Sequence, residues 1–289
     1  MRRLAHFLFD SLVILVAAAA LSAWLLESTP GASVDARQLD PQYSQQTLDA
    51  MAAERQQQRS LTGRSGAWLL AILKGDLGRS ELSGLPVVQL LRERGGVTAT
   101  TMTLGAASGF LAGTLVAGSV VLLAPVMAEW IATAAFLALL SLPAGLLVLF
   151  AVFGRVPVEA AVGAVVAPRV YFYAARLFRQ QKNAGWFLHG IASGIGPLRL
   201  ALFQALPAIR SELSALLGFA LITALAACIP AEVLSGQPGI GQLAWRSAME
   251  RDLPVVIGVT MTIALVSRAV TMLSAIPASS TSPESRWSA

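Results

Sequence analysis

Six long apolar blocks are the feature of this sequence that most constrains its fold. The blocks cover residues 7–26, 99–124, 130–153, 157–175, 208–231 and 254–276. Most of them approach the roughly 20 apolar residues that an α-helix needs to cross the hydrocarbon core of a bilayer. Charged residues make up only 13% of the chain, whereas soluble domains average about 25%. The sequence therefore predicts an all-α polytopic membrane protein with about six transmembrane helices.

The first block has two interpretations. Arg2 and Arg3 precede it, and the residues LSA at 21–23 resemble a signal-peptide cleavage site. The length of the block is closer to that of a spanning helix than to that of a signal peptide. We therefore expect residues 1–27 to form an uncleaved first transmembrane helix.

The polar segments between the blocks define the predicted topology. An even number of spans puts both termini on one side of the membrane, and short cytoplasmic flanks collect lysine and arginine. This rule places both termini and the basic stretch 177–206 in the cytoplasm, with segments 28–98 and 232–253 outside. Residues 99–276 then form a transmembrane core of five helices, and residues 277–289 form a polar cytoplasmic tail. The net charge of +5 fits this topology, and no basic-aromatic stripe points to nucleic acid.

Small residues and prolines mark two of the blocks. Gly105, Gly109 and Gly113 recur every four residues, a spacing that lets two helix backbones approach closely in a membrane. Sparse glycine in an ordinary spanning helix is the alternative. Pro143 and Gly145 lie in the middle of the third block, where we expect a kink.

The sequence contains no convincing catalytic or metal-binding constellation. Its only histidines, His6 and His189, lie in different segments, and Cys228 is the only cysteine. Phosphate-loop, zinc-protease and serine-hydrolase motifs are absent. We expect the ionisable residues of the apolar blocks to lie near the ends of the spans; these residues are Glu129, Glu159, Arg169 and Arg268.

A glycine- and proline-rich elbow separates the last two blocks. The residues of interest in it are Glu232, Pro238, Gly239, Gly241, Arg251, Asp252 and Pro254. We expect Pro230 to end the preceding helix and the elbow glycines to permit backbone turns. Asp252 is predicted to cap the last helix, with Pro254 in its first turn. Because irregular backbone at membrane depth needs a protein or aqueous lining, we interpret the elbow as an external re-entrant segment.

Four stretches carry a family likeness. In chain order they are STPGA at 28–32, KGDLGRSELSGLPVVQLLRER at 74–94, ARLFRQ at 175–180 with RLALFQALP at 199–207, and LSGQPGIG at 234–241 followed by RDLPVV at 251–256. Together they resemble the inner-membrane permease subunit of bacterial ABC importers of the dipeptide, oligopeptide and nickel type. The likeness covers nearly the whole chain, and Glu232 fits the acidic residue that the family tends to have before the elbow. The family pattern has one residue at the place where this chain has two, Gly236 and Gln237.

The same family has a cytoplasmic coupling loop with a Glu-Ala-Ala-type motif and a following glycine. The corresponding residues here are Ala184, Gly185, Trp186, Phe187, Leu188, His189 and Gly190, with Arg199, Gln204 and Pro207 downstream. Trp186 stands where a small residue is usual, and His189 stands where a lysine is usual. The resemblance implies that residues 184–206 seat a short helix in a groove of a cytoplasmic ATPase, with Trp186, Phe187 and Leu188 as a hydrophobic knob. A surface helix on lipid headgroups is the alternative.

The resemblance implies a permease that forms half of a translocation pathway for peptides or a similar small solute in the bacterial inner membrane. The partners that it implies are a second permease subunit in a heterodimer, two cytoplasmic ATPase subunits or domains, an external substrate-binding protein and the lipid bilayer. The chain itself would then be no enzyme and hold no cofactor, because the ATPase binds the ATP. Two alternatives are a degenerate paralogue that acts as a scaffold or assembly subunit, and a stand-alone secondary transporter.

Overall fold

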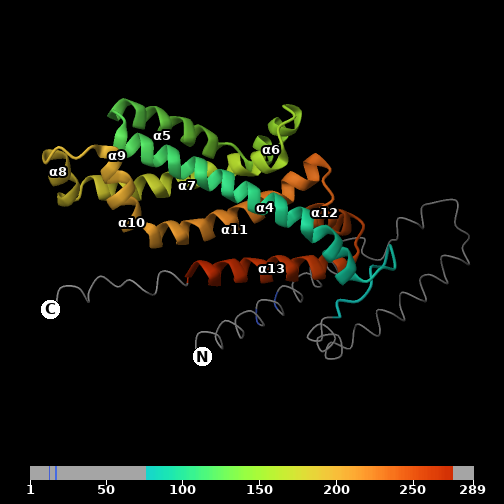
Figure 1. Cartoon of the computed structure of the whole chain (residues 1–289). Helices are drawn as coiled ribbons and strands as arrows, with labels where there is room; N and C mark the ends of the chain where they lie inside the picture. The colour runs from blue at the N-terminus through green and yellow to red at the C-terminus, as the bar shows by residue number, and fades with distance from the viewer. Residues whose placement is uncertain (1–12, 14–16, 18–75, 276–289) are drawn as a thin grey trace, which may run out of the picture. The chain divides into compact units, whose positions relative to one another are not determined.

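A computed structural model describes residues 76–275, together with Val13 and Ala17 as isolated helical positions (Figure 1). The predicted first helix, the part of the external segment before residue 76 and the predicted tail lie outside the described residues. The chain divides into two compact units. One comprises Met1–Glu93 and Ala244–Leu265, and the other comprises Arg94–Leu243 and Val266–Ala289.

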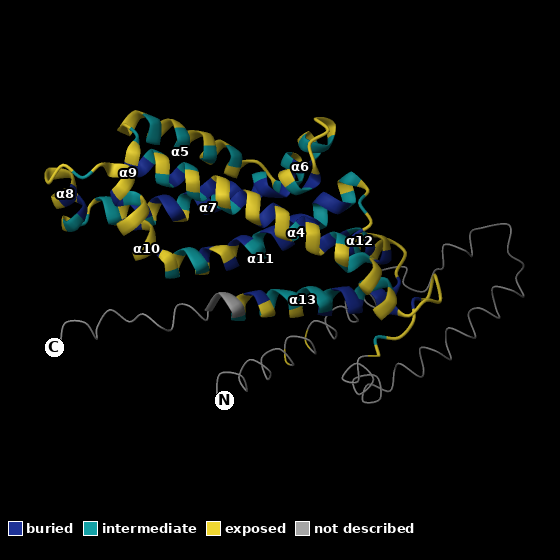
Figure 2. Cartoon of the chain, viewed as in Figure 1, coloured by how far each residue is buried: buried dark blue, intermediate teal, exposed yellow. Residues whose placement is uncertain are grey.

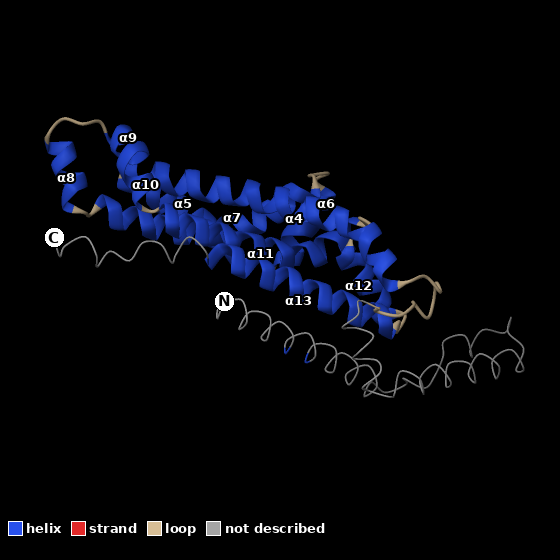
Figure 3. Ribbon diagram, turned by 60° about the horizontal axis from the view of Figure 1, so that its bottom comes forward, coloured by secondary structure: helices blue, strands red, loops and turns tan. Residues whose placement is uncertain are grey.

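The described residues are overwhelmingly helical, and none of them forms a strand of a sheet (Figure 3). The helices of ten residues or more are α4 (Val87–Gly118), α5 (Val126–Ser141), α6 (Ala144–Phe153), α7 (Val158–Lys182), α11 (Arg210–Ser235), α12 (Ile240–Met249) and α13 (Leu253–Ala275). The shorter elements are the π-helical turns η2 (Ser119–Leu123) and η3 (Ala201–Ala205) and the helices α8 (Gly185–Ala192), α9 (Pro197–Leu200) and α10 (Leu206–Ala208).

Within the described residues, four helical segments are long and apolar enough to cross a membrane. They are Val87–Leu123, Val158–Lys182, Arg210–Ser235 and Leu253–Met272, and the bent pair α5–α6 adds a fifth if it counts as one span. These segments confirm the predicted all-α membrane class. The first of the six predicted helices is among the residues that the structure leaves undescribed.

The kink predicted in the third block is a sharp break between α5 and α6. The axes of α5 and α6 meet at 96°, and the break falls at Leu142 and Pro143. The proline ring disfavours helical backbone at the preceding residue. Leu142 accordingly adopts an extended conformation, with φ −81° and ψ 135°. Pro143 then precedes the first residue of α6, where its missing N–H costs nothing.

Helix α7 is the most deeply buried of the four segments (Figure 2). It packs against α5, α6 and α11 and against the turn η2. The sequence suggested a weak span ending at residue 175, but the helix continues to Lys182. The interior residues of α7 in the core include Val162, Val165, Val166, Val170, Tyr171, Ala174 and Phe178.

The glycine stripe of α4 is a helix-packing surface, as its spacing predicts. A Cβ atom added to Gly109 would lie 2.6 Å from Val166 Cβ and 2.7 Å from the Gly163 carbonyl oxygen. One added to Gly113 would lie 2.7 Å from the Ala167 carbonyl oxygen. No side chain fits at these positions, so the backbones of α4 and α7 approach each other as closely as glycine permits.

Candidate functional site

The predicted coupling loop folds as a short helix directly after α7. The chain leaves α7 at Lys182, passes Asn183 and Ala184, and forms α8, which packs on the ends of α7 and α9 (Figure 1). Ala184 has an extended backbone, and its carbonyl accepts the Phe187 N–H at 3.0 Å. This is the start of the predicted short helix, and Gly190 lies in its last turn.

One side of α8 is fixed to the body of the protein. Phe187 is only 4% exposed, and its ring lies 5.5 Å from the ring of Trp186 in an edge-on arrangement. A Cβ atom at Gly190 would lie 2.7 Å from a Leu200 methyl carbon. Gly190 is therefore the residue that lets α8 lie against α9.

The other side of α8 is open. Leu188 is 61% exposed, and Ile191 is exposed beside it. The predicted three-residue knob is therefore corrected: Phe187 packs into the core, Trp186 is half-buried, and Leu188, about 100° further around the helix, is the exposed residue of the three. Exposed apolar side chains also occur on α9 and η3, at Leu198, Leu202 and Phe203. The predicted loop residues Gly185, His189, Arg199, Gln204 and Pro207 are also exposed.

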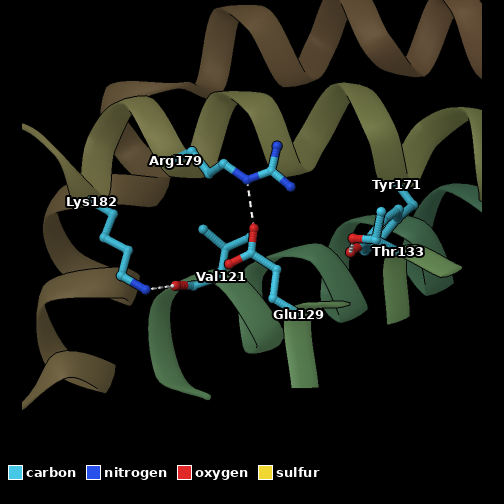
Figure 4. A network of polar contacts seen from close by, with 6 residues as sticks. All are labelled: Val121, Glu129, Thr133, Tyr171, Arg179 and Lys182. Atoms are coloured by element: carbon cyan, nitrogen blue, oxygen red, sulfur yellow. Dashed lines mark hydrogen bonds and ion pairs between the residues drawn. The ribbon is translucent and has the colours of Figure 1, made fainter. Parts of the chain in front are cut away.

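Two polar contacts brace the end of α7 from which α8 departs (Figure 4). Arg179 Nε forms an ion pair with Glu129 Oε1 of α5 at 2.5 Å. Lys182 Nζ donates to the Val121 carbonyl oxygen at 2.6 Å. Val121 lies in the π-helical turn η2, where the α4 segment ends and carbonyl groups lose their helical partners. The two contacts tie the last turn of α7 to the elements before it, and no local sequence pattern predicts them.

Arg169 corrects a second expectation. The extension of α7 to Lys182 puts this residue near the middle of the helix instead of near its end. Its guanidinium donates to the Val165 carbonyl oxygen at 2.6 Å. A charged side chain in the middle of a spanning helix is costly and commonly functional.

At the elbow, Glu232 holds the start of α12. This residue is fully buried in α11, and its Oε2 atom accepts the Gly241 N–H at 2.6 Å. The Thr98 hydroxyl of α4 accepts the neighbouring Ile240 N–H at 2.8 Å. The first N–H groups of a helix have no partners inside it, and a carboxylate there is also favoured by the helix dipole. Glu232 and Thr98 therefore act together as the cap of α12.

The elbow glycines serve a different purpose from the expected one. Gly239 and Gly241 have no positive φ. A Cβ atom on Gly239 would collide with the Glu232 carboxylate, and one on Gly241 would lie 2.7 Å from Ile229 Cα. These two glycines allow close approach to α11, and the backbone turn belongs to Gly236, whose φ is 72°.

Gly236 and Gln237 form the turn between α11 and α12. Helix α11 does not end at Pro230 but continues through it to Ser235, and Gly236 ends it in the left-handed conformation. This is a common way for a helix to end, because glycine has no Cβ penalty there. The Gln237 carbonyl accepts the Gly239 N–H at 2.8 Å, so Gln237 begins the turn that leads past Pro238 into α12.

Asp252 meets a segment far away in the sequence. Its carboxylate accepts the Ser80 hydroxyl at 2.5 Å and the Glu81 N–H at 3.2 Å. Its carbonyl accepts the Val256 N–H at 3.0 Å, which places Asp252 directly before α13 and Pro254 in the first turn of that helix. The helix-start position is confirmed, while the side chain connects α13 to the loop that carries Ser80. Arg251, just before, has a positive φ of 58°.

The structure thus brings together parts of the predicted site in two clusters. Glu232, Gly239 and Gly241 form one, and Asp252 forms the other with Ser80 and Glu81. The stretch 232–253 contains the end of α11 and all of α12, so most of the predicted re-entrant segment is helical. Among the described residues, no group of histidine, cysteine, aspartate and glutamate side chains could hold a metal ion.

These features define the chain as an α-helical membrane protein. No model of a known protein family matches the chain, and no curated protein matches it in sequence.

Proposed function

We propose that this protein is a membrane-spanning permease subunit of an ATP-driven importer, and that it forms half of the pathway for peptides or a similar small solute. In this proposal the chain pairs with a second permease subunit as a heterodimer. The complete importer also contains two cytoplasmic ATPase subunits or domains and an external substrate-binding protein. The membrane is the bacterial inner membrane, with both termini in the cytoplasm. The chain catalyses nothing itself, and ATP is bound by the ATPase.

The observation that carries the proposal is the geometry of α8. Phe187 and Gly190 hold one side of this helix against the body, while Leu188 and Ile191 on the other side are open to a partner. An apolar helix face of this kind suits a groove on a second protein.

The bracing of α7 supports a mechanical role for the same helix. Helix α8 contacts α7, so a force on α8 acts on α7. Arg179 and Lys182 then connect the last turn of α7 to α5 and to η2. Helix α7 in turn contacts most of the core. Closure of an ATPase dimer then tilts α7 together with the helices packed on it, provided that nucleotide and substrate bind the two states with different affinities.

A purification experiment tests this proposal. The tagged chain is isolated from its native membranes in mild detergent, and vanadate-sensitive ATP hydrolysis is measured in the eluate. We expect the activity to co-purify with the wild type and to be lost with Leu188→Asp. Leu82→Asp is the matched control, because Leu82 is also an exposed leucine but lies in the loop before α4.

The alternatives give different results. A stand-alone transporter would bring down no ATPase in any preparation, and that result would overturn the proposal. A scaffold or assembly subunit would retain the ATPase without any stimulation of hydrolysis by substrate and binding protein.

A further inference from the structure

A groove of about 460 Å³ lies between α7 and α11, close to the end at which α8 departs. A volume of this size is within the range of ligand-binding clefts. The groove is lined by Tyr173, Arg176, Leu177, Gln180, Glu212, Ala215, Leu216 and Phe219. The rings of Tyr173 and Phe219 lie 5.3 Å apart in an edge-on arrangement.

The lining changes character along the helices. Tyr173 pairs with Phe219, and the later residue Gln180 shares the groove with the earlier residue Glu212, so the two helices run antiparallel here. The polar residues Arg176, Gln180 and Glu212 therefore lie toward the helix ends. Tyr173 and Phe219 lie further toward the middle of the two spans. This order parallels that of a bilayer, with polar groups at the surface and apolar groups beneath.

The polar end of the groove carries both signs of charge. Arg176 and Glu212 are exposed, and no ion pair joins them in the described part of the chain. Glu212 accepts a hydrogen bond from the Ser211 hydroxyl at 2.8 Å, which leaves its second oxygen atom for a ligand. A headgroup with a positive and a negative group complements this pair.

We propose that the groove binds an aminophospholipid, whose headgroup carries a phosphate and a primary ammonium group. Arg176 and Gln180 bind the phosphate oxygens, since guanidinium and phosphate form strong charge-assisted hydrogen bonds. Glu212 accepts hydrogen bonds from the ammonium group. One acyl chain lies along Leu177, Leu216 and Phe219. A choline headgroup fits less well, because its quaternary ammonium has no N–H to donate.

Lipid retention measured by native mass spectrometry tests the proposal. The full chain is purified in detergent, delipidated and titrated with dioleoyl phosphatidylethanolamine or dioleoyl phosphatidylcholine. We expect the wild type to retain the ethanolamine lipid in preference to the choline lipid. Arg176→Gln should weaken retention of both lipids by roughly tenfold, the usual consequence of losing one hydrogen bond to a charged group. Glu212→Gln should abolish the preference for ethanolamine.

Two further variants make the test specific to the groove. Ala215→Leu fills the groove from within its lining and should reduce retention of both lipids, with thermal unfolding recorded to confirm that the variant is folded. Arg92→Gln removes an exposed arginine of α4 outside the groove and should change nothing. The proposal is overturned by equal retention of the two lipids in the wild type, or by groove variants that behave like Arg92→Gln. Displacement of the lipid by free phosphoethanolamine at equal concentration would also overturn it, because the site would then take a soluble zwitterion.

Discussion

The hydroxyl of Ser80 donates a 2.5 Å hydrogen bond to the carboxylate of Asp252, a residue 172 positions later in the chain. Both side chains are buried. The bond joins the loop before α4 to the start of α13, and both residues belong to the same compact unit. The bond therefore joins residues 74–94 to residues 251–256, two stretches singled out from the sequence.

Ser80→Ala should destabilise this unit. The substitution leaves one Asp252 oxygen buried without its partner, which costs about 1–3 kcal/mol. Thermal unfolding in detergent measures the loss, and hydrogen exchange should show faster opening of residues 76–86. Ser83→Ala is the control, because Ser83 is an exposed serine of the same loop. Equal effects of the two substitutions would show that the bond to Asp252 contributes nothing.

Gly239→Ala and Gly96→Ala should change stability in opposite directions. A methyl group at Gly239 collides with the buried Glu232 carboxylate, while nothing lies within 4 Å of one at Gly96. Overpacking at Gly239 should cost about 1–3 kcal/mol, and alanine at the helical Gly96 should add roughly 0.5–1 kcal/mol. Chemical unfolding of the two variants beside the wild type measures both effects. A neutral Gly239→Ala would mean that Glu232 moves aside easily.

The same argument predicts a strong effect in the glycine stripe of α4. Gly109→Ala places a methyl group 2.6 Å from Val166 Cβ, with the Gly163 backbone at 2.7 Å. Backbone atoms cannot move aside as a flexible side chain can, so we expect a loss of at least about 2 kcal/mol, at the upper part of the overpacking range. Gly145→Ala, with no atom within 4 Å of the new Cβ, is the matched comparison. The stripe would not be a close-packing surface if the two variants unfolded at the same temperature.

The sequence predicted the parts of this fold that depend on local pattern. Apolar length identified the spanning helices, and the four-residue spacing of Gly105, Gly109 and Gly113 identified a close helix contact. The position of Asp252 before the last helix also followed from its local sequence. These features are properties of one segment and its period.

The sequence did not predict what depends on contacts between distant segments. The purpose of Gly239 became visible only with Glu232 lying against it, and the partner of Asp252 lies before α4. The prediction that α11 ends at Pro230 was wrong, because a proline in a membrane helix is tolerated when neighbouring groups compensate for the lost hydrogen bond. Similarly, Phe187 and Leu188 are adjacent and equally apolar, and only the packing of α8 decides which of them is buried.

Lys182→Met should loosen α8 without unfolding the protein. The methionine keeps most of the apolar length of the side chain but leaves the Val121 carbonyl without the donor that now lies 2.6 Å away. We expect faster hydrogen exchange in residues 183–192. The free energy of unfolding should fall by at most about 1–3 kcal/mol, the cost of a buried carbonyl without a donor, because water can reach part of the site and replace the lost bond. Arg176→Met is the comparison, because that arginine lies in the same region of α7 but outside the bracing contacts, and it should leave the exchange of α8 unchanged. Glu129→Gln tests the second contact at the end of α7. It removes the ion pair to Arg179, which is partly exposed, so the free energy of unfolding should fall by only about 0.2–1 kcal/mol.

The Lys182→Met result decides whether the contact with Val121 braces α8. If Lys182→Met leaves exchange in α8 unchanged, the end of α7 is held by core packing alone, and the contact with Val121 does not brace the helix.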